Sequence, residues 1–246
     1  MERRLKLAIA YDGSAFAGWQ SQVHKNTIQD RLESAFRQVS HRSASVQGAG
    51  RTDAGVHALA QCAHVDVIDR GWPPERWRTA INALLPPSIR ITRASYTSAG
   101  FHARFSAKGK VYQYTLWNAE ILPPFEYRRA WHIIRPLDRA MLLAAAAKFE
   151  GTHDFRLFAA NRGKPVETTI RTIRLVRITF RGPRIAIRFD GDGFLYKMVR
   201  LMAGAIVHCA QGKSSLEEIT GRLALRGSVS RAAAPADGLL LLRVRY

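Results

Sequence analysis

The chain has 246 residues, 47% of them hydrophobic and 23% charged, and because the two kinds alternate throughout, the composition excludes a disordered protein. Its 38 Lys and Arg residues outnumber its 19 Asp and Glu residues, which gives a net charge of +19. A field of that sign attracts polyanions, so nucleic acid is the first partner to expect. Thirty of the basic residues are arginines, whose forked guanidinium suits phosphate, although an arginine-rich genome produces the same excess.

The beginning of the chain, MERRLKLAIAYDG, is interrupted by Asp12 too early for the apolar core of a signal peptide. No stretch approaches the length of a membrane span, which argues against a membrane partner. Cys62 and Cys209 lie far apart and match neither a disulfide framework nor a zinc motif. We therefore expect a reduced, cytoplasmic protein without a metal site.

Hydrophobic periodicity in the first hundred residues predicts alternating strands and helices. The predicted strands cover residues 5–11, 46–50, 58–68 and 88–96. The predicted helices cover residues 28–39, after a start signal at Thr27 and Asp30, and 73–87, which is bracketed by prolines. The order β-α-β-β-α-β is the split pattern of a ferredoxin-like unit.

The second half repeats this theme with a different sequence. Its predicted strands cover residues 110–118, 169–180, 184–190 and 238–246. Its predicted helices begin at Asp138, at Tyr196 and at Ser215, and the first ends before Gly151. No low-complexity linker separates the halves, so we expect them to pack tightly, with a boundary near Gly100. We expect an N-terminal α/β unit over 1–100 and a C-terminal one over 101–246. The predicted fold class is α/β (α+β), with two ferredoxin-like or RRM-like units that share a mainly antiparallel sheet and leave a central RNA-binding cleft.

Several catalytic signatures fail on inspection. The segment GKSS at Gly212 lacks the earlier glycine of a P-loop. GDGFLY ends in Tyr196 and is not a dinucleotide fingerprint, and the chain contains neither GxSxG nor HExxH. A carboxylate, aromatic rings and arginines remain as candidates for chemistry.

The carboxylate is Asp53, in the glycine-rich segment GAGRTDAG. An aspartate among glycines most often bonds to its own backbone in a turn. The alternative is a nucleophile, because the neighbouring small residues admit a large planar ligand and Arg51 would help to keep the carboxylate ionised.

The other candidates also have two interpretations. Tyr112 lies in an aromatic and basic stretch that is either a half-buried strand or a base-stacking platform beside phosphate contacts. Arg200 shares a helix face with Lys197, and this face is either a solvated edge or a source of a partner for a buried carboxylate. We interpret His153 and Asp154 as turn residues, because adjacent loop side chains rarely point the same way.

Together, several segments resemble the tRNA pseudouridine synthase A family almost from end to end. The segments that carry the resemblance are YDGSAFAGWQ, GRTDAGVHA, FHARFSAKGKVYQY, FEGTHDF, GDGFLYKMVR and the closing GLLL, in the family's order. The resemblance implies that Asp53 is the nucleophile, that Arg51 displaces the target base and holds its phosphate, and that Tyr112 stacks on the uracil. It further implies that Arg200 pairs with the aspartate and that Leu239 forms an apolar wall.

The resemblance also implies a reaction and partners. The family isomerises uridine to pseudouridine at positions 38, 39 and 40 of the tRNA anticodon stem-loop, as a homodimer, without metal or cofactor. The sequence leaves open whether Asp53 attacks C1′ or C6. A non-catalytic tRNA-binding or RNA-folding protein on the same scaffold is the alternative, and a synthase acting on ribosomal RNA is disfavoured by the motif around Asp53.

Overall fold

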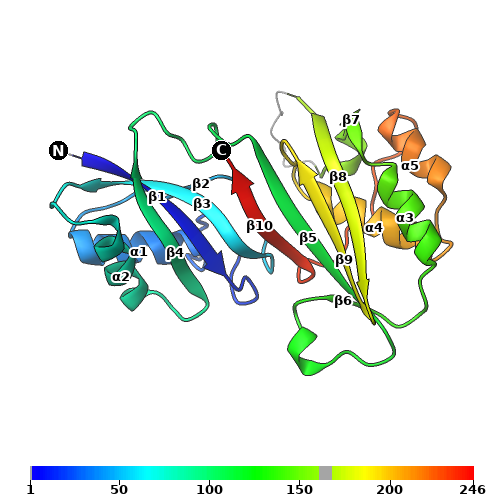
Figure 1. Ribbon diagram of the computed structural model, residues 1–246, viewed down its shortest axis with the longest axis horizontal. Coiled ribbons are helices and arrows are strands. Elements are labelled where there is room, and N and C mark those ends of the chain that lie inside the picture. The colour runs from blue at the N-terminus through cyan, green and yellow to red at the C-terminus, as the bar shows by residue number, and fades with distance from the viewer. Residues whose placement is uncertain (1, 161–167) are drawn as a thin grey trace. The chain divides into compact units, whose positions relative to one another are not determined.

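The computed structural model describes residues 2–160 and 168–246, which form two compact units (Figure 1). The first unit comprises Met1–Lys108 with Leu240–Tyr246, and the second comprises Gly109–Leu239. These bounds differ from the predicted domains at two segments. Residues 101–108 and the end of the chain belong to the first unit, where Lys108 N–H donates to the Arg245 carbonyl at 2.8 Å and the Tyr246 hydroxyl donates to the Ala103 carbonyl at 2.7 Å. The division of the chain into domains at residues 1–100 and 101–246 stays a prediction.

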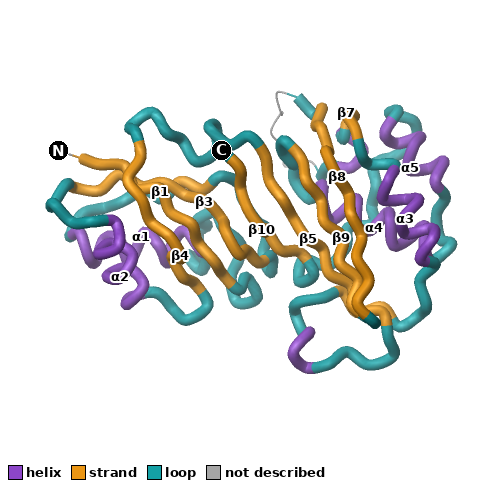
Figure 2. The backbone as a smooth tube through the Cα atoms, in the orientation of Figure 1, coloured by secondary structure: helices purple, strands orange, loops and turns teal. Residues whose placement is uncertain are grey.

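The first unit has the split β-α-β-β-α-β order that the sequence predicts. Its strands are β1 (Glu2–Tyr11), β2 (Gln47–Gly48), β3 (His57–Ile68), β4 (Ile89–Thr97) and, from Leu240 onward, β10 (Leu239–Arg245). Strand β1 lies between β4 and β3 and is antiparallel to both, while β10 pairs with β3 in parallel. Helices α1 (Ile28–Ser40) and α2 (Pro74–Leu84) lie side by side along this sheet (Figure 2).

Alternation along β1 explains where the core of the first unit forms. Leu5, Leu7 and Ile9 are almost fully buried, and the helices add Phe36 and Trp77, whose rings stack with centroids 6.2 Å apart. Burial of each such side chain stabilises the fold by roughly 1.5–3 kcal/mol. The hydroxyl oxygen of Thr27 accepts from Asp30 N–H at 3.2 Å, so the predicted helix start is confirmed.

The second unit is also mixed, and its sheet is mainly antiparallel. Its strands are β5 (Gly109–Asn118), β6 (Trp131–Ile133), β7 (Gly151–Asp154), β8 (Ile170–Arg181) and β9 (Arg184–Gly191). The strand order is β5-β9-β8-β7, with the short β6 parallel to β5. The helices are α3 (Arg139–Ala147), α4 (Met198–Ala210) and α5 (Leu216–Leu223), with 3-10 turns at Pro124–Glu126 and Arg156–Phe158. The predicted α+β class is confirmed.

Two local predictions in the second unit are wrong. His153 and Asp154 are not turn residues but belong to β7, because they pair with Arg171 and Ile170 of β8. Helix α4 begins at Met198, two residues later than predicted, because Lys197 adopts a left-handed backbone with φ 58°. Lys197 therefore precedes the helix and does not share a helix face with Arg200.

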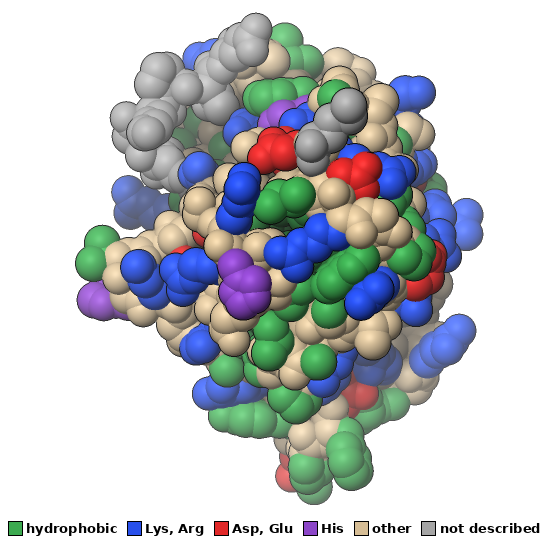
Figure 3. Space-filling view, turned by 90° about the vertical axis from the view of Figure 1, so that its left-hand side faces the viewer, with side chains coloured by type: hydrophobic (Ala, Val, Ile, Leu, Met, Phe, Trp, Pro, Cys, Tyr) green, Lys and Arg blue, Asp and Glu red, His purple; other side chains and the backbone are tan. Residues whose placement is uncertain are grey.

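On the face that Figure 3 presents, Lys and Arg side chains are scattered between apolar ones, and Asp and Glu side chains are fewer. Among residues 2–160 and 168–246, no helix is long and apolar enough to cross a membrane. The predominance of Lys and Arg over Asp and Glu side chains on the face in Figure 3 agrees with the totals of 38 and 19 in the sequence.

Candidate functional site

Arg51 and Asp53 lie in the loop between β2 and β3, and hydrogen bonds fix the backbone of this loop. Trp19 N–H donates to the Thr52 carbonyl at 3.0 Å, and Val56 N–H donates to the Asp53 carbonyl at 3.2 Å. The side-chain Nε2 of Gln61 donates to the Gly50 carbonyl at 2.8 Å. The half-buried Asp53 side chain therefore projects from a backbone that is held both within the loop and by neighbouring elements.

The segment YDGSAFAGWQ packs directly against this loop, backbone to backbone. Gly18 has φ +91°, and a Cβ atom there would lie 2.6 Å from the Thr52 carbonyl oxygen. A Cβ atom at Gly13 would lie 2.0 Å from the Val56 carbonyl oxygen. Glycine at both positions is thus a steric requirement for the close approach of the two segments.

The buried side chains of Tyr11 and Gln61, which the sequence analysis did not single out, make hydrogen bonds to this loop. The Tyr11 hydroxyl and the Thr52 hydroxyl are hydrogen-bonded at 2.8 Å, and both residues are buried. Burial raises the pKa of the Tyr11 phenol, so it stays protonated and keeps this bond. Gln61 is fully buried in the stretch ALAQCA of β3, and its place among small and apolar residues was the available signal, because buried polar groups are placed to make hydrogen bonds.

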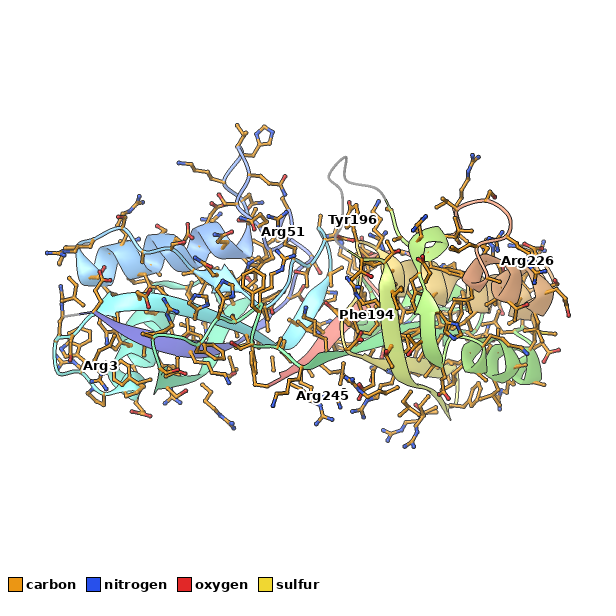
Figure 4. All side chains as sticks on the ribbon, turned by 90° about the horizontal axis from the view of Figure 1, so that it is seen from above. Arg3, Arg51, Phe194, Tyr196, Arg226 and Arg245 are labelled. Atoms are coloured by element: carbon orange, nitrogen blue, oxygen red, sulfur yellow. The ribbon has the colours of Figure 1, made fainter. Side chains whose placement is uncertain are left out.

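The guanidinium of Arg51 is held by a glutamine. Its Nε donates to Oε1 of Gln20 at 3.0 Å. Arg51 is exposed, and Figure 4 places it on the helix side of the first unit's sheet, with Arg245 on the opposite side.

In the second unit, Tyr112 lies on β5 opposite Phe189 of β9 and is only 8% exposed. Its ring meets the ring of Phe194 edge to face, with centroids 5.2 Å apart and planes at 85°. Phe194 comes from the segment between β9 and α4 that Figure 4 labels with Tyr196. These contacts fix the orientation of the Tyr112 ring.

Arg200 and Leu239 both make hydrogen bonds to residues 234–236, which precede β10. Nε of Arg200 donates to the Ala234 carbonyl at 2.8 Å, and Ala234 N–H donates back to the Arg200 carbonyl at 3.0 Å. The buried Leu239 donates its N–H to the Ala236 carbonyl at 2.9 Å. This segment passes so close to α4 that a Cβ atom at Gly204 would collide with the Ala232 carbonyl oxygen at 1.6 Å.

The structure therefore distributes the five predicted site residues over both units. Arg51 and Asp53 lie together in the first unit, whereas Tyr112, Arg200 and Leu239 lie in the second. Within the described ranges, no group of three or more His, Cys, Asp or Glu side chains is arranged to hold a metal ion. The first unit thus offers one carboxylate in a fixed loop and one arginine anchored through Nε, and the second unit offers one fixed aromatic ring and one arginine anchored through Nε.

A family model described as tRNA pseudouridine synthase matches residues 7–106 and 145–246. The chain belongs to this family. The matched tRNA pseudouridine synthase segments contain Arg51, Asp53, Arg200 and Leu239, and Tyr112 lies between them. Membership makes the chain an isomerase that acts on tRNA, which confirms the resemblance found in the sequence.

Relatives at high identity carry the same family name. A protein of Akkermansia muciniphila named tRNA pseudouridine synthase A is 46% identical over 253 residues, which cover 99% of this chain and 95% of the relative. Proteins of the same name from Solidesulfovibrio magneticus and Methylacidiphilum infernorum are 44% and 41% identical and cover 99% and 98% of this chain. The alignments span 91% and 94% of these two relatives, so the similarity extends over nearly the whole length of each protein.

Proposed function

We propose that this pseudouridine synthase isomerises uridine at positions 38, 39 and 40 of the tRNA anticodon stem-loop, with Asp53 as the nucleophile. The observation that carries the proposal is the fixed loop around Asp53, in which Gly13 and Gly18 allow backbone contact and Gln61 holds Gly50. A nucleophile must keep one geometry relative to the reacting carbon, and a loop held in this way supplies it.

The chemistry requires a nucleophile but neither an oxidant nor a group donor. Asp53 attacks C1′ or C6 and forms a covalent bond there, the bond from C1′ to N1 breaks, and the detached uracil rotates. A bond from C1′ to C5 then forms, and the bond to Asp53 breaks, either by displacement from C1′ or by elimination from C6, which regenerates the carboxylate. The proton on C5 leaves and N1 takes up a proton, so the product has the composition of the substrate. The proposed reaction therefore needs no metal and no cofactor.

The remaining site residues receive roles that suit their side chains. Arg51 holds the phosphate of the displaced nucleotide, and Tyr112 stacks on the uracil, which supplies roughly 1–3 kcal/mol per base. Arg200 pairs with the Asp53 carboxylate, and Leu239 forms an apolar wall for the base. A uracil leaves its helix at a cost of a few kcal/mol, which these contacts offset. The proposal includes a central cleft for the RNA, a homodimer and a cytoplasmic location.

Mapping of the product tests the proposal. Wild-type protein and Asp53→Ala are incubated with unmodified tRNA transcripts in EDTA, and pseudouridine is located by carbodiimide labelling and primer extension. We expect product at positions 38 to 40 from the wild type alone. Product elsewhere in the tRNA would refute the anticodon stem-loop assignment. Tight tRNA binding by both proteins without any product would support the non-catalytic tRNA-binding alternative.

A further inference from the structure

An unbroken line of side-chain hydrogen bonds runs from Arg51 into helix α1. Nε of Arg51 donates to Oε1 of Gln20 at 3.0 Å, and Nε2 of Gln20 donates to Oε1 of Gln29 at 2.7 Å. Nε2 of Gln29 donates in turn to Oε1 of Glu33 at 2.8 Å. Every donor in the line points from the arginine end toward the carboxylate end, so the bonds polarise one another in the same sense.

Two backbone N–H groups fix this direction. Ser21 N–H donates to Oε1 of Gln29 at 3.0 Å, and Val46 N–H donates to Oε1 of Glu33 at 3.0 Å. An N–H group requires an acceptor, so the Gln29 amide cannot exchange its oxygen and nitrogen without losing the bond to Ser21. Gln20 must then present its nitrogen to Gln29 and its oxygen to Arg51.

Backbone bonds connect the same elements in parallel with the side chains. Gln29 N–H donates to the Trp19 carbonyl at 3.0 Å, and Trp19 N–H donates to the Thr52 carbonyl at 3.0 Å. Gln29 and Glu33 are four residues apart on α1 and therefore share one helix face. The helix, the segment around Gln20 and the loop that carries Arg51 are thus joined at both backbone and side-chain level.

We propose that Gln20 and Gln29 are positioning residues that orient Arg51 for an RNA phosphate, an inference that rests on the phosphate-binding role given to Arg51 above. Because Nε of Arg51 is engaged by Gln20, the phosphate is bound end-on by the two Nη atoms, whose parallel N–H groups match two phosphate oxygens. Gln29 touches neither Arg51 nor, in this scheme, the RNA, and acts only through Gln20.

A double-mutant cycle tests this assignment. Single-turnover rates at saturating enzyme are measured on tRNA for the wild type, Gln29→Leu, Arg51→Ala and the double variant. We expect Gln29→Leu to slow the wild type by about 10-fold, since misplacement of a positioning group by ~1 Å costs up to ~100-fold. In the Arg51→Ala background, the same change should have no further effect. Gln20→Leu should behave in the same way as Gln29→Leu.

Gln38→Leu is the matched control, because Gln38 lies exposed on the same helix and its Nε2 donates to the hydroxyl oxygen of Ser34 at 3.4 Å. It should keep the wild-type rate and the wild-type melting temperature. Equal slowing by Gln29→Leu in both backgrounds would show a general structural effect and overturn the positioning role, as would no slowing at all. If Arg51→Ala itself keeps the wild-type rate, the phosphate-binding role of Arg51 fails, and the positioning role fails with it.

Discussion

The contacts that hold the ring of Tyr112 would also form with a phenylalanine ring at this position. It is 8% exposed and meets Phe194 edge to face at 5.2 Å, and neither observation depends on the hydroxyl group. We expect Tyr112→Phe to leave the Kd for tRNA within about threefold, because stacking is a property of the ring. We expect the Tyr112 hydroxyl to help move the proton from C5, so single turnover should slow by about 10-fold or more, since a general acid or base typically contributes at least that much. Unchanged single-turnover rates would confine Tyr112 to stacking.

His64 makes the stability of the first unit depend on pH. Its Nδ1 accepts a hydrogen bond from Ala103 N–H at 3.1 Å, which requires the unprotonated nitrogen. Burial lowers the pKa of His64 below its usual 6.5, and the neighbouring Arg4 and His102 lower it further, whereas Asp66 opposes the shift. The unfolded chain therefore binds a proton on His64 at a higher pH than the folded chain does, so stability is lost as the pH falls below about 6.5.

The matched variant for this effect is His64→Asn, because Oδ1 of asparagine replaces Nδ1 as an acceptor without titrating. We expect the melting temperature of the wild type to fall more than that of His64→Asn between about pH 7.5 and pH 5.5. The other titrating groups remain in both proteins, so their effects cancel. Equal losses would show that His64 does not carry the pH dependence.

At the scale of elements, the contact between residues 11–20 and the Asp53 loop depends on Gly18. Alanine at a left-handed position costs about 1 kcal/mol for the backbone alone. At Gly18 the added Cβ would also lie 2.6 Å from the Thr52 carbonyl oxygen, and such overpacking costs a further ~1–3 kcal/mol. Gly71 is the matched control, because it has φ +66° and no atom within 4 Å of an added Cβ.

We therefore expect Gly18→Ala to lower the free energy of unfolding by about 1–3 kcal/mol more than Gly71→Ala does, as measured by urea denaturation. Gly18→Ala should also slow pseudouridine formation, because the Asp53 loop must move to relieve the contact. Wild-type activity in Gly18→Ala would show that the backbone contact does not position Asp53.

Most of the elements could be predicted from the sequence, because their patterns are local. Leu5, Leu7 and Ile9 alternate along β1, and Ser215 marks the start of α5 with its hydroxyl oxygen 3.3 Å from Glu218 N. Strands β6 and β7, with only three and four residues, are too short for any periodicity to appear. Their formation depends on pairing with β5 and β8, which is a tertiary effect.

The candidate site likewise has residues that could be predicted from the sequence and contacts that could not. Arg51 and Asp53 stand in a recognisable motif, so their types and positions were available from the sequence. The bond from Arg51 to Gln20 joins residues 31 positions apart, and the bond from Tyr11 to Thr52 joins residues 41 apart. No local pattern encodes such pairs, so the groups that hold the site emerged only from the fold.

For the whole molecule, the net charge of +19 predicts that tRNA binding weakens as the salt concentration rises. RNA binding that neutralises phosphates releases counterions, so log K falls linearly with log salt concentration, at about −0.7 to −0.9 per phosphate contact. We expect a slope of about −4 or steeper for tRNA, because a broadly basic surface contacts many phosphates. A flat dependence in filter-binding titrations would contradict phosphate contacts as the main source of affinity.

The most direct test of the central claim is tritium release from tRNA that carries [5-³H]uridine, with wild type and Asp53→Asn compared at equal tRNA occupancy. The substitution keeps the size of the side chain and removes its nucleophilicity. We predict that the wild type releases tritium as C5 joins C1′, and that Asp53→Asn is slower by at least about 10³-fold while its Kd for tRNA stays within threefold. Release by Asp53→Asn at the wild-type rate would contradict the assignment of Asp53 as the nucleophile.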